Sequence, residues 1–162
     1  MDKIKSLLLP LAFIFATIAA FETGIRYGAT NMRAHAIAGE LVFPLATLVQ
    51  GKGQLDQNSM NGITAVIDNG IAAGAMHRQL WYLDKDAKAA LDKVLAYAFS
   101  VRGDGVVERI AVAENKKDLD VSKRERLAKV REAITAAKAD LVDNAPEPTE
   151  NEVSLSEAVV AE

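Results

Sequence analysis

The chain contains no cysteine and only two histidines among its 162 residues. Without cysteine, this chain has no disulfide, no thiolate nucleophile and no cysteine-based zinc site. His35 and His77 lie far apart and lack the spacing of a zinc-binding motif. Each lies on an apolar helical stripe, where a hydrogen-bonded core histidine is expected. No Walker loop, Gly-x-Ser-x-Gly motif or glycosylation sequon occurs either. The sequence therefore predicts no metal and no cofactor.

Aromatic residues are also scarce, at 6%, whereas alanine is abundant. A core built from Ala, Leu, Val and Ile suits closely packed helices. The net charge of −3 is unevenly distributed, because residues 144–162 carry five Glu and no Lys or Arg. The remainder is only slightly positive, which argues against nucleic-acid binding. Residues 144–162 are expected to form a disordered acidic tail.

The longest apolar run, Leu7–Phe21, follows Lys3 and Lys5 and ends at Glu22. A basic start, an apolar middle and a polar edge are typical of a signal peptide or a membrane anchor. A helix of about 15 residues spans about 22 Å, short of a hydrocarbon core of about 30 Å, which favours a signal peptide. Cleavage near Ala20 would give a periplasmic or secreted protein.

The residues after this run favour a retained anchor. The chain stays fairly apolar as far as Tyr27, so one membrane helix over residues 7–27 would place Tyr27 in the interfacial aromatic belt. Glu22 and Arg26 would pair near the headgroups. We favour this interpretation: a single pass through the inner membrane, with the N-terminus inside and the domain outside. A core helix of a cytosolic protein is the alternative to both.

Small and apolar residues recur at spacings of four and three from Phe21 to Val49. This stripe predicts that the first helix continues outward from the membrane. The stripe consists of Phe21, Ile25, Gly28, Met32, His35, Gly39, Val42, Ala46 and Val49. Gly24 and Gly28 have the spacing that lets two membrane helices approach closely. Pro44 is expected to kink or end the helix. The candidates for packing against a partner are Gly24, Gly28, Met32, Gly39, Val42 and Trp81.

Residues 51–62 are rich in Gly, Asn and Ser, which predicts a loop. Residues 63–83 keep helical spacing on two apolar stripes, which predicts a largely buried helix. A β-hairpin is the alternative, because Asn69-Gly70 is the usual signal of a type I′ turn. The alanines around this pair favour the helix.

A third helix is predicted over Asp84–Val101, on a stripe of apolar residues at helical spacing. Asp84 or Asp86 would cap its N-terminus, and Gly103 would end it.

Two shorter signals follow along the chain. Residues 106–114 predict a short helix with Asp104 as its N-cap, and a strand over 106–112 is the alternative. Residues 122–142 predict the last helix, with a capping box formed by Ser122 and Glu125. The chain is therefore predicted to be all-α in three parts. These are a signal or anchor helix (1–28), a helical envelope domain (29–143) of about four to five helices, and the acidic tail (144–162).

Glu40 and Asp68 are the acidic residues within otherwise apolar segments. A carboxyl group buried there could act as a general acid, as in enzymes that cleave cell-wall polymers. No supporting motif accompanies either residue. We regard His35, Glu40, Asp68 and His77 as candidates for lining a pocket.

The leading functional hypothesis is a non-enzymatic envelope protein. It would scaffold or bind a protein partner, or a second copy, through helix packing. A small-ligand or stress sensor is one alternative, with a polar pocket near His35, His77 and Trp81. A cell-wall-active enzyme using Glu40 or Asp68 is another. Exposed apolar surface near residues 39–49 would favour the scaffold, and a deep cleft with Glu40 at its floor would favour the enzyme.

Overall fold

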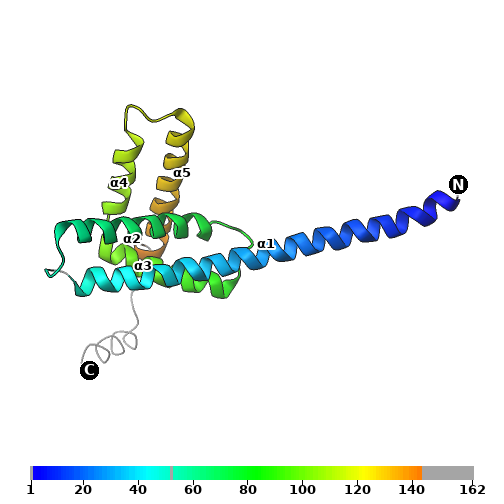
Figure 1. The fold of residues 1–162 in the computed structure, drawn as a ribbon, viewed down its shortest axis with the longest axis horizontal. Coiled ribbons are helices and arrows are strands. Elements are labelled where there is room, and N and C mark those ends of the chain that lie inside the picture. Colours follow the sequence, from blue (N-terminus) through cyan, green and yellow to red (C-terminus); the bar gives the residue numbers. More distant parts are fainter. Residues whose placement is uncertain (1, 52, 144–162) are drawn as a thin grey trace, which may run out of the picture.

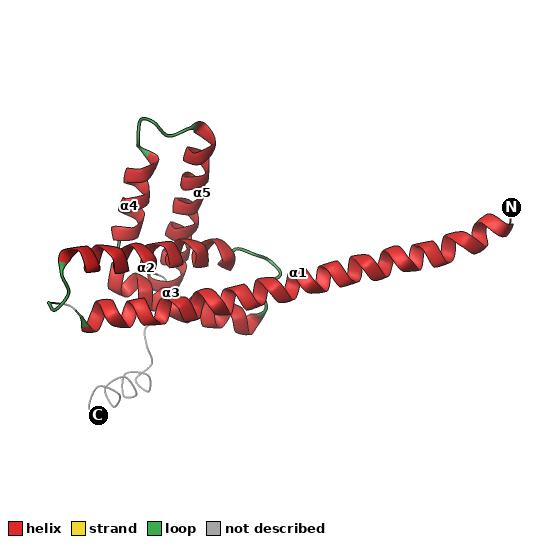
Figure 2. Ribbon diagram, in the orientation of Figure 1, coloured by secondary structure: helices red, strands yellow, loops and turns green. Residues whose placement is uncertain are grey.

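The computed structural model describes the backbone of residues 2–51 and 53–143, and the side chains of 13–51 and 53–142. All regular structure in these ranges is helical, which confirms the all-α prediction (Figure 2). The helices are α1 (Asp2–Gln50), α2 (Gln57–Arg78), α3 (Lys85–Arg102), α4 (Gly105–Glu114) and α5 (Val121–Lys138), and α5 ends in a π-helical turn, η1 (Ala139–Asp143). The predicted acidic tail, 144–162, lies outside the described residues.

α1 is a helix of 49 residues whose N-terminal half projects from the rest of the molecule (Figure 1). It crosses residue 28, the expected edge of the membrane segment, without a break. Beyond that point Ala34, Ile37, Leu41 and Leu45 recur every three or four residues and are at most 2% exposed. This spacing places them on one side of the helix, where they pack against the bundle. α1 is therefore both the free N-terminal rod and a core helix.

Pro44 was predicted to kink or end the helix, and it does not end α1, which continues to Gln50. A proline lacks the N–H that would bond the carbonyl of Glu40, four residues earlier. Glu40 itself is an exposed residue. One turn further on, the Thr47 hydroxyl donates to the Phe43 carbonyl (2.9 Å), and Leu45 is 1% exposed in the core. The packing of the last turns outweighs the missing hydrogen bond.

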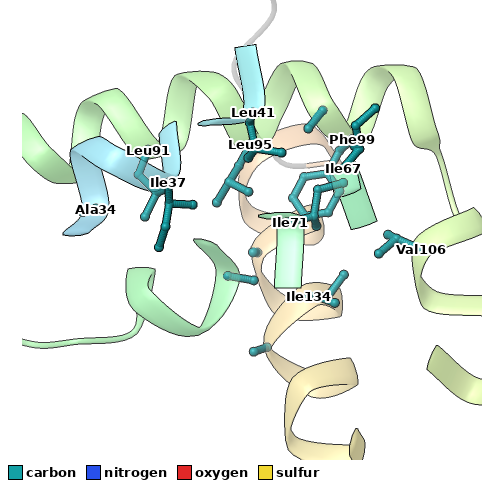
Figure 3. Close-up of a cluster of buried hydrophobic side chains, with 14 of the residues drawn as sticks. Ala34, Ile37, Leu41, Ile67, Ile71, Leu91, Leu95, Phe99, Val106 and Ile134 are labelled. Carbon is teal, nitrogen blue, oxygen red and sulfur yellow. The ribbon is translucent and has the colours of Figure 1, made fainter. Parts of the chain in front are cut away.

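The core lies where α2 and α3 pack along α1 and where α5 packs on α2. α4 and α5 form a pair that projects away from α1 (Figure 1). The largest fully buried side chains come from all five helices (Figure 3): Ile37, Leu41, Leu45, Ile67, Ile71, Leu91, Leu95, Phe99, Val106 and Ile134. The core is thus aliphatic with one phenylalanine, as the composition suggested.

Residues 63–78 are helical, as predicted, and the hairpin alternative is wrong, but α2 ends at Arg78 and residues 79–83 form the turn before α3. α2 starts at Gln57, inside the expected loop, because the Asp56 carboxylate accepts the N–H groups of Asn58 (2.8 Å) and Ser59 (3.0 Å). Gly70 does not form a turn. A Cβ atom built on it would lie 2.5 Å from Leu41 Cδ2, so glycine here allows α1 and α2 to approach closely.

The predicted ends of α3 are confirmed. The Asp84 carboxylate accepts the N–H of Ala87 at 2.7 Å and caps the N-terminus. Gly103 follows the helix with φ of 55°, a conformation that glycine adopts easily.

The helix from residue 106 is confirmed as α4, and the strand alternative is wrong, but two caps differ from the prediction. Asp104 makes no side-chain bond to the start of α4. Its carboxylate instead accepts a hydrogen bond from Lys138 Nζ at 2.6 Å. α5 begins one residue before Ser122, because Asp120 is the N-cap and accepts the N–H of Lys123 at 2.9 Å. An aspartate two positions earlier displaces the predicted capping box.

Candidate interaction surface

The side of α1 that faces away from the bundle is apolar and exposed. We call this surface the outer face of α1, and it comprises Met32, His35, Ala36, Gly39, Val42, Phe43 and Val49. Met32 is 76% exposed and Phe43 is 78% exposed. The stripe read from the sequence therefore exists, but it lies roughly a third of a turn from the buried stripe. His35 is exposed, so the expectation of a core histidine is wrong there.

The glycines predicted for helix packing also lie open. Cβ atoms built on Gly24, Gly28 or Gly39 would meet nothing within 4 Å. Gly24 and Gly28 precede Met32 by two and one helical turns, so they share its side of the helix. The outer face therefore continues along α1 toward its N-terminal half, with room for a second helix.

A groove beside the outer face extends it onto α3. It encloses about 310 Å³ and lies next to Val42 and Val49 of α1 and Val94 and Tyr97 of α3. Tyr97 is 49% exposed. The sequence analysis did not single out Phe43 or Tyr97. Their signal was weak, since Phe43 follows the stripe residue Val42 and Tyr97 adjoins a core position.

Trp81 lies apart from the outer face. It is 92% exposed, in the turn between α2 and α3. A hollow of about 540 Å³ next to it is lined by Thr23, Arg26, Tyr27, Trp81, Tyr82 and Leu83. Tyr27 precedes the buried Asn31 by one turn, so it lies on the bundle-facing side of α1. Neither histidine lines this hollow.

Asn31 holds the turn between α2 and α3 against α1. The sequence analysis did not identify this residue. Its side chain is buried, with 7% exposed, and its Oδ1 accepts the backbone N–H of Asp84 at 3.0 Å. A buried amide that accepts a backbone hydrogen bond fixes local geometry, since breaking the bond would leave a polar group unsatisfied. The only signal in the sequence was an asparagine one turn after Tyr27.

Asp68 is buried, as the sequence suggested, but it is fully engaged. It is 4% exposed, and its carboxylate accepts Arg102 Nε (2.7 Å) and Nη2 (3.1 Å) and Arg109 Nη1 (3.1 Å). These bonds join α2 to α3 and α4. The arrangement is that of a structural ion pair between helices.

Glu40 and His77 are not brought together with Asp68. Glu40 is exposed and lines a shallow groove between α1 and α2 beside Arg33 and Asn69. His77 is half-buried, and partial burial together with the charge of Arg33 lowers its pKa below the ordinary value of 6.5. Within residues 13–51 and 53–142, no group of three or more histidine or acidic side chains could hold a metal ion.

Comparison of the chain with models of protein families, with curated proteins and with solved structures found no match.

Proposed function

We propose that this chain is a non-enzymatic, membrane-anchored scaffold whose outer face of α1 packs against a helix of a protein partner or of a second copy. The observation that carries the proposal is the exposure of Met32, Val42 and Phe43 on one side of α1, where no other helix of the described residues covers them. Large exposed apolar side chains gathered on one face are typical of interaction sites. Exposed apolar surface near residues 39–49 is also the feature expected to favour a scaffold over an enzyme.

The length of α1 supports the anchor. Among the described residues, α1 over Phe13–Gln50 is long and apolar enough to cross a membrane. Because the helix continues past Phe21, residues 7–27 reach about 31 Å, which matches a hydrocarbon core of about 30 Å. Arg26 then lies at the outer edge of this core, and Glu22 lies one helical turn further in, paired with it at 3.5 Å between the nitrogen and oxygen atoms. The short apolar run that favoured a signal peptide, Leu7–Phe21, is only the N-terminal part of this segment.

Membrane fractionation tests the anchor. We expect epitope-tagged full-length protein to stay in the membrane pellet after alkaline extraction, and its mass to include residues 1–20. A soluble product that begins near Phe21 would mean that the segment is a cleaved signal and would refute the anchor.

Site-directed photocrosslinking tests the partner surface. The chain has no cysteine, so a single introduced thiol is the only attachment point for a benzophenone maleimide. We expect Met32→Cys and Phe43→Cys to give a discrete crosslinked product in membranes. A product of twice the chain mass identifies a second copy, and another mass identifies a different protein.

Glu125→Cys, on an exposed position of α5, is the matched control and should give no discrete product. Equal crosslinking from Glu125 and from the outer face, or none from either, would contradict the proposed surface.

A further inference from the structure

The turn between α2 and α3 exposes the chain's only tryptophan. Trp81 is 92% exposed, and its ring meets that of Tyr82 edge-on at a centroid distance of 5.3 Å. A large indole left in water contributes nothing to the core of a folded protein. Tryptophan and tyrosine favour sites where one end of the ring is apolar and the other is hydrated, such as a membrane surface.

The position of this turn on α1 is fixed. Asn31 accepts the backbone N–H of Asp84, and the turn is closed by bonds from the Leu80 N–H to the His77 carbonyl and from the Leu83 N–H to the Leu80 carbonyl. Trp81 is therefore held at the level of Thr23–Tyr27, the residues that line the hollow beside it. In Figure 1 this turn is the part of the bundle that lies along α1 where the free N-terminal half begins.

That level coincides with the end of the apolar part of α1. Phe13, Phe15, Ile18 and Phe21 are all more than half exposed on the free helix. In the proposed anchor residues 7–27 cross the hydrocarbon core, so Tyr27 lies at its outer edge, where the headgroup region begins. Arg26 lines the same hollow and is 79% exposed, so its guanidinium can reach a lipid phosphate.

We propose that the α2–α3 turn is a second membrane contact, in which Trp81 enters the interfacial region of the phospholipid bilayer that α1 spans. Tyr27 and Tyr82 complete an aromatic cluster at this level, and Arg26 supplies the charge that complements the phosphates. The inference rests on the proposed anchor. Its consequence is that the domain contacts the bilayer at two points and has a fixed tilt.

Trp81 itself is the probe, because it is the only tryptophan in the chain. Full-length protein is reconstituted into vesicles of phosphatidylcholine and phosphatidylglycerol, with or without lipids brominated high on the acyl chain. We expect the Trp81 emission to shift to shorter wavelength in vesicles and to be quenched by the brominated lipid. We also expect aqueous iodide to quench Trp81 several-fold less than it quenches an exposed tryptophan placed at position 121, the control described next.

The control moves the tryptophan within the same chain. A Trp81→Phe, Val121→Trp variant places it at the start of α5, where Val121 is 69% exposed at the end of the α4–α5 pair that projects away from α1. This probe should remain accessible to iodide and unaffected by brominated lipid.

Flotation of the vesicles separates the possible failures. Protein that floats, but whose Trp81 is not quenched by brominated lipid, refutes the second contact and leaves the anchor standing. Protection from iodide without quenching by brominated lipid would mean that a protein covers Trp81, and this result would also refute the second membrane contact. Protein that does not float refutes the anchor and the second contact together.

Discussion

At the scale of single residues, Asp68 carries the clearest energetic role. Its carboxylate is buried and bonded to two guanidinium groups. We expect Asp68→Ala to lower the free energy of unfolding by about 3 kcal/mol, because it leaves the charge of Arg102 without a partner in a half-buried place. Urea denaturation of the detergent-solubilised protein measures the loss.

Two variants check this prediction. Lys123→Ala removes an ion pair whose side chains are 72% and 53% exposed, and it should change stability by no more than about 0.5 kcal/mol. The double variant Asp68→Leu, Arg102→Met should lose less free energy of unfolding than Asp68→Ala, because it leaves no buried charge without a partner. A double variant as unstable as the single one would argue against the ion-pair explanation.

His77 gives a prediction on pH. Burial, and secondarily the charge of Arg33, lower its pKa in the folded protein. Below about pH 6.5 the unfolded chain therefore binds a proton that the folded chain resists. The contribution of His77 to stability is present above this pH and is lost as the pH falls through the lowered pKa. The melting temperature should therefore fall between about pH 7.5 and pH 5. His77→Gln should make this fall smaller.

An imidazole titration by NMR tests the cause directly. Arg33→Gln removes the secondary cause, so the pKa of His77 should rise toward 6.5. An unchanged His77 pKa in this variant would show that burial alone lowers it.

At the scale of elements, two glycines of α2 form a matched pair. A Cβ on Gly70 would lie 2.5 Å from Leu41 Cδ2, and Leu41 is only 1% exposed, whereas a Cβ on Gly62 would meet nothing within 4 Å. Gly62→Ala should raise the free energy of unfolding by up to about 1 kcal/mol, because alanine has a higher helix propensity than glycine. Gly70→Ala should be less stable than Gly62→Ala by about 1 to 3 kcal/mol, because the packed core must shift. Equal gains from both in thermal unfolding would show that α1 and α2 do not meet closely at Gly70.

The helices themselves were predictable because apolar residues recur with helical spacing over long segments. The predictions that failed rested on local sequence signals that tertiary packing can override. Pro44 predicted a helix end, but Leu45 and the turns after it are held by the core. Asn69-Gly70 is a turn signal only where the chain is free to turn, and here the glycine is needed for a close contact with Leu41.

The candidate site was predictable in part for the same reason. Spacing identified the stripe through Met32 and Val42, but spacing alone cannot tell which of two neighbouring stripes is buried. The role of Asp68 was not predictable, because its partners come from α3 and α4, more than 30 positions along the chain. Only the fold brings Arg102 and Arg109 to it.

At the scale of the whole molecule, α1 fixes the rotation of the bundle relative to the free N-terminal half. Each residue inserted after Gly28 should turn one half by about 100° relative to the other. We expect one inserted alanine to abolish crosslinking from Phe43→Cys while leaving that from Ile25→Cys. Seven inserted residues, about two turns, should restore crosslinking from Phe43→Cys. Crosslinking from Phe43→Cys that survives every insertion would show that the two halves engage partners independently.

The unbroken α1 also has a consequence for the order in which the protein is made. In chain order α1 precedes the two helices that pack along it, so Ile37, Leu41 and Leu45 leave the ribosome before α2 and α3 exist. In the proposed anchored protein, this apolar stripe is already at the membrane surface before the later helices are made. Those helices then pack onto a helix that the membrane holds in place. The apolar stripe is then most vulnerable to mispairing during synthesis, when a neighbouring nascent chain could occupy the place of α2.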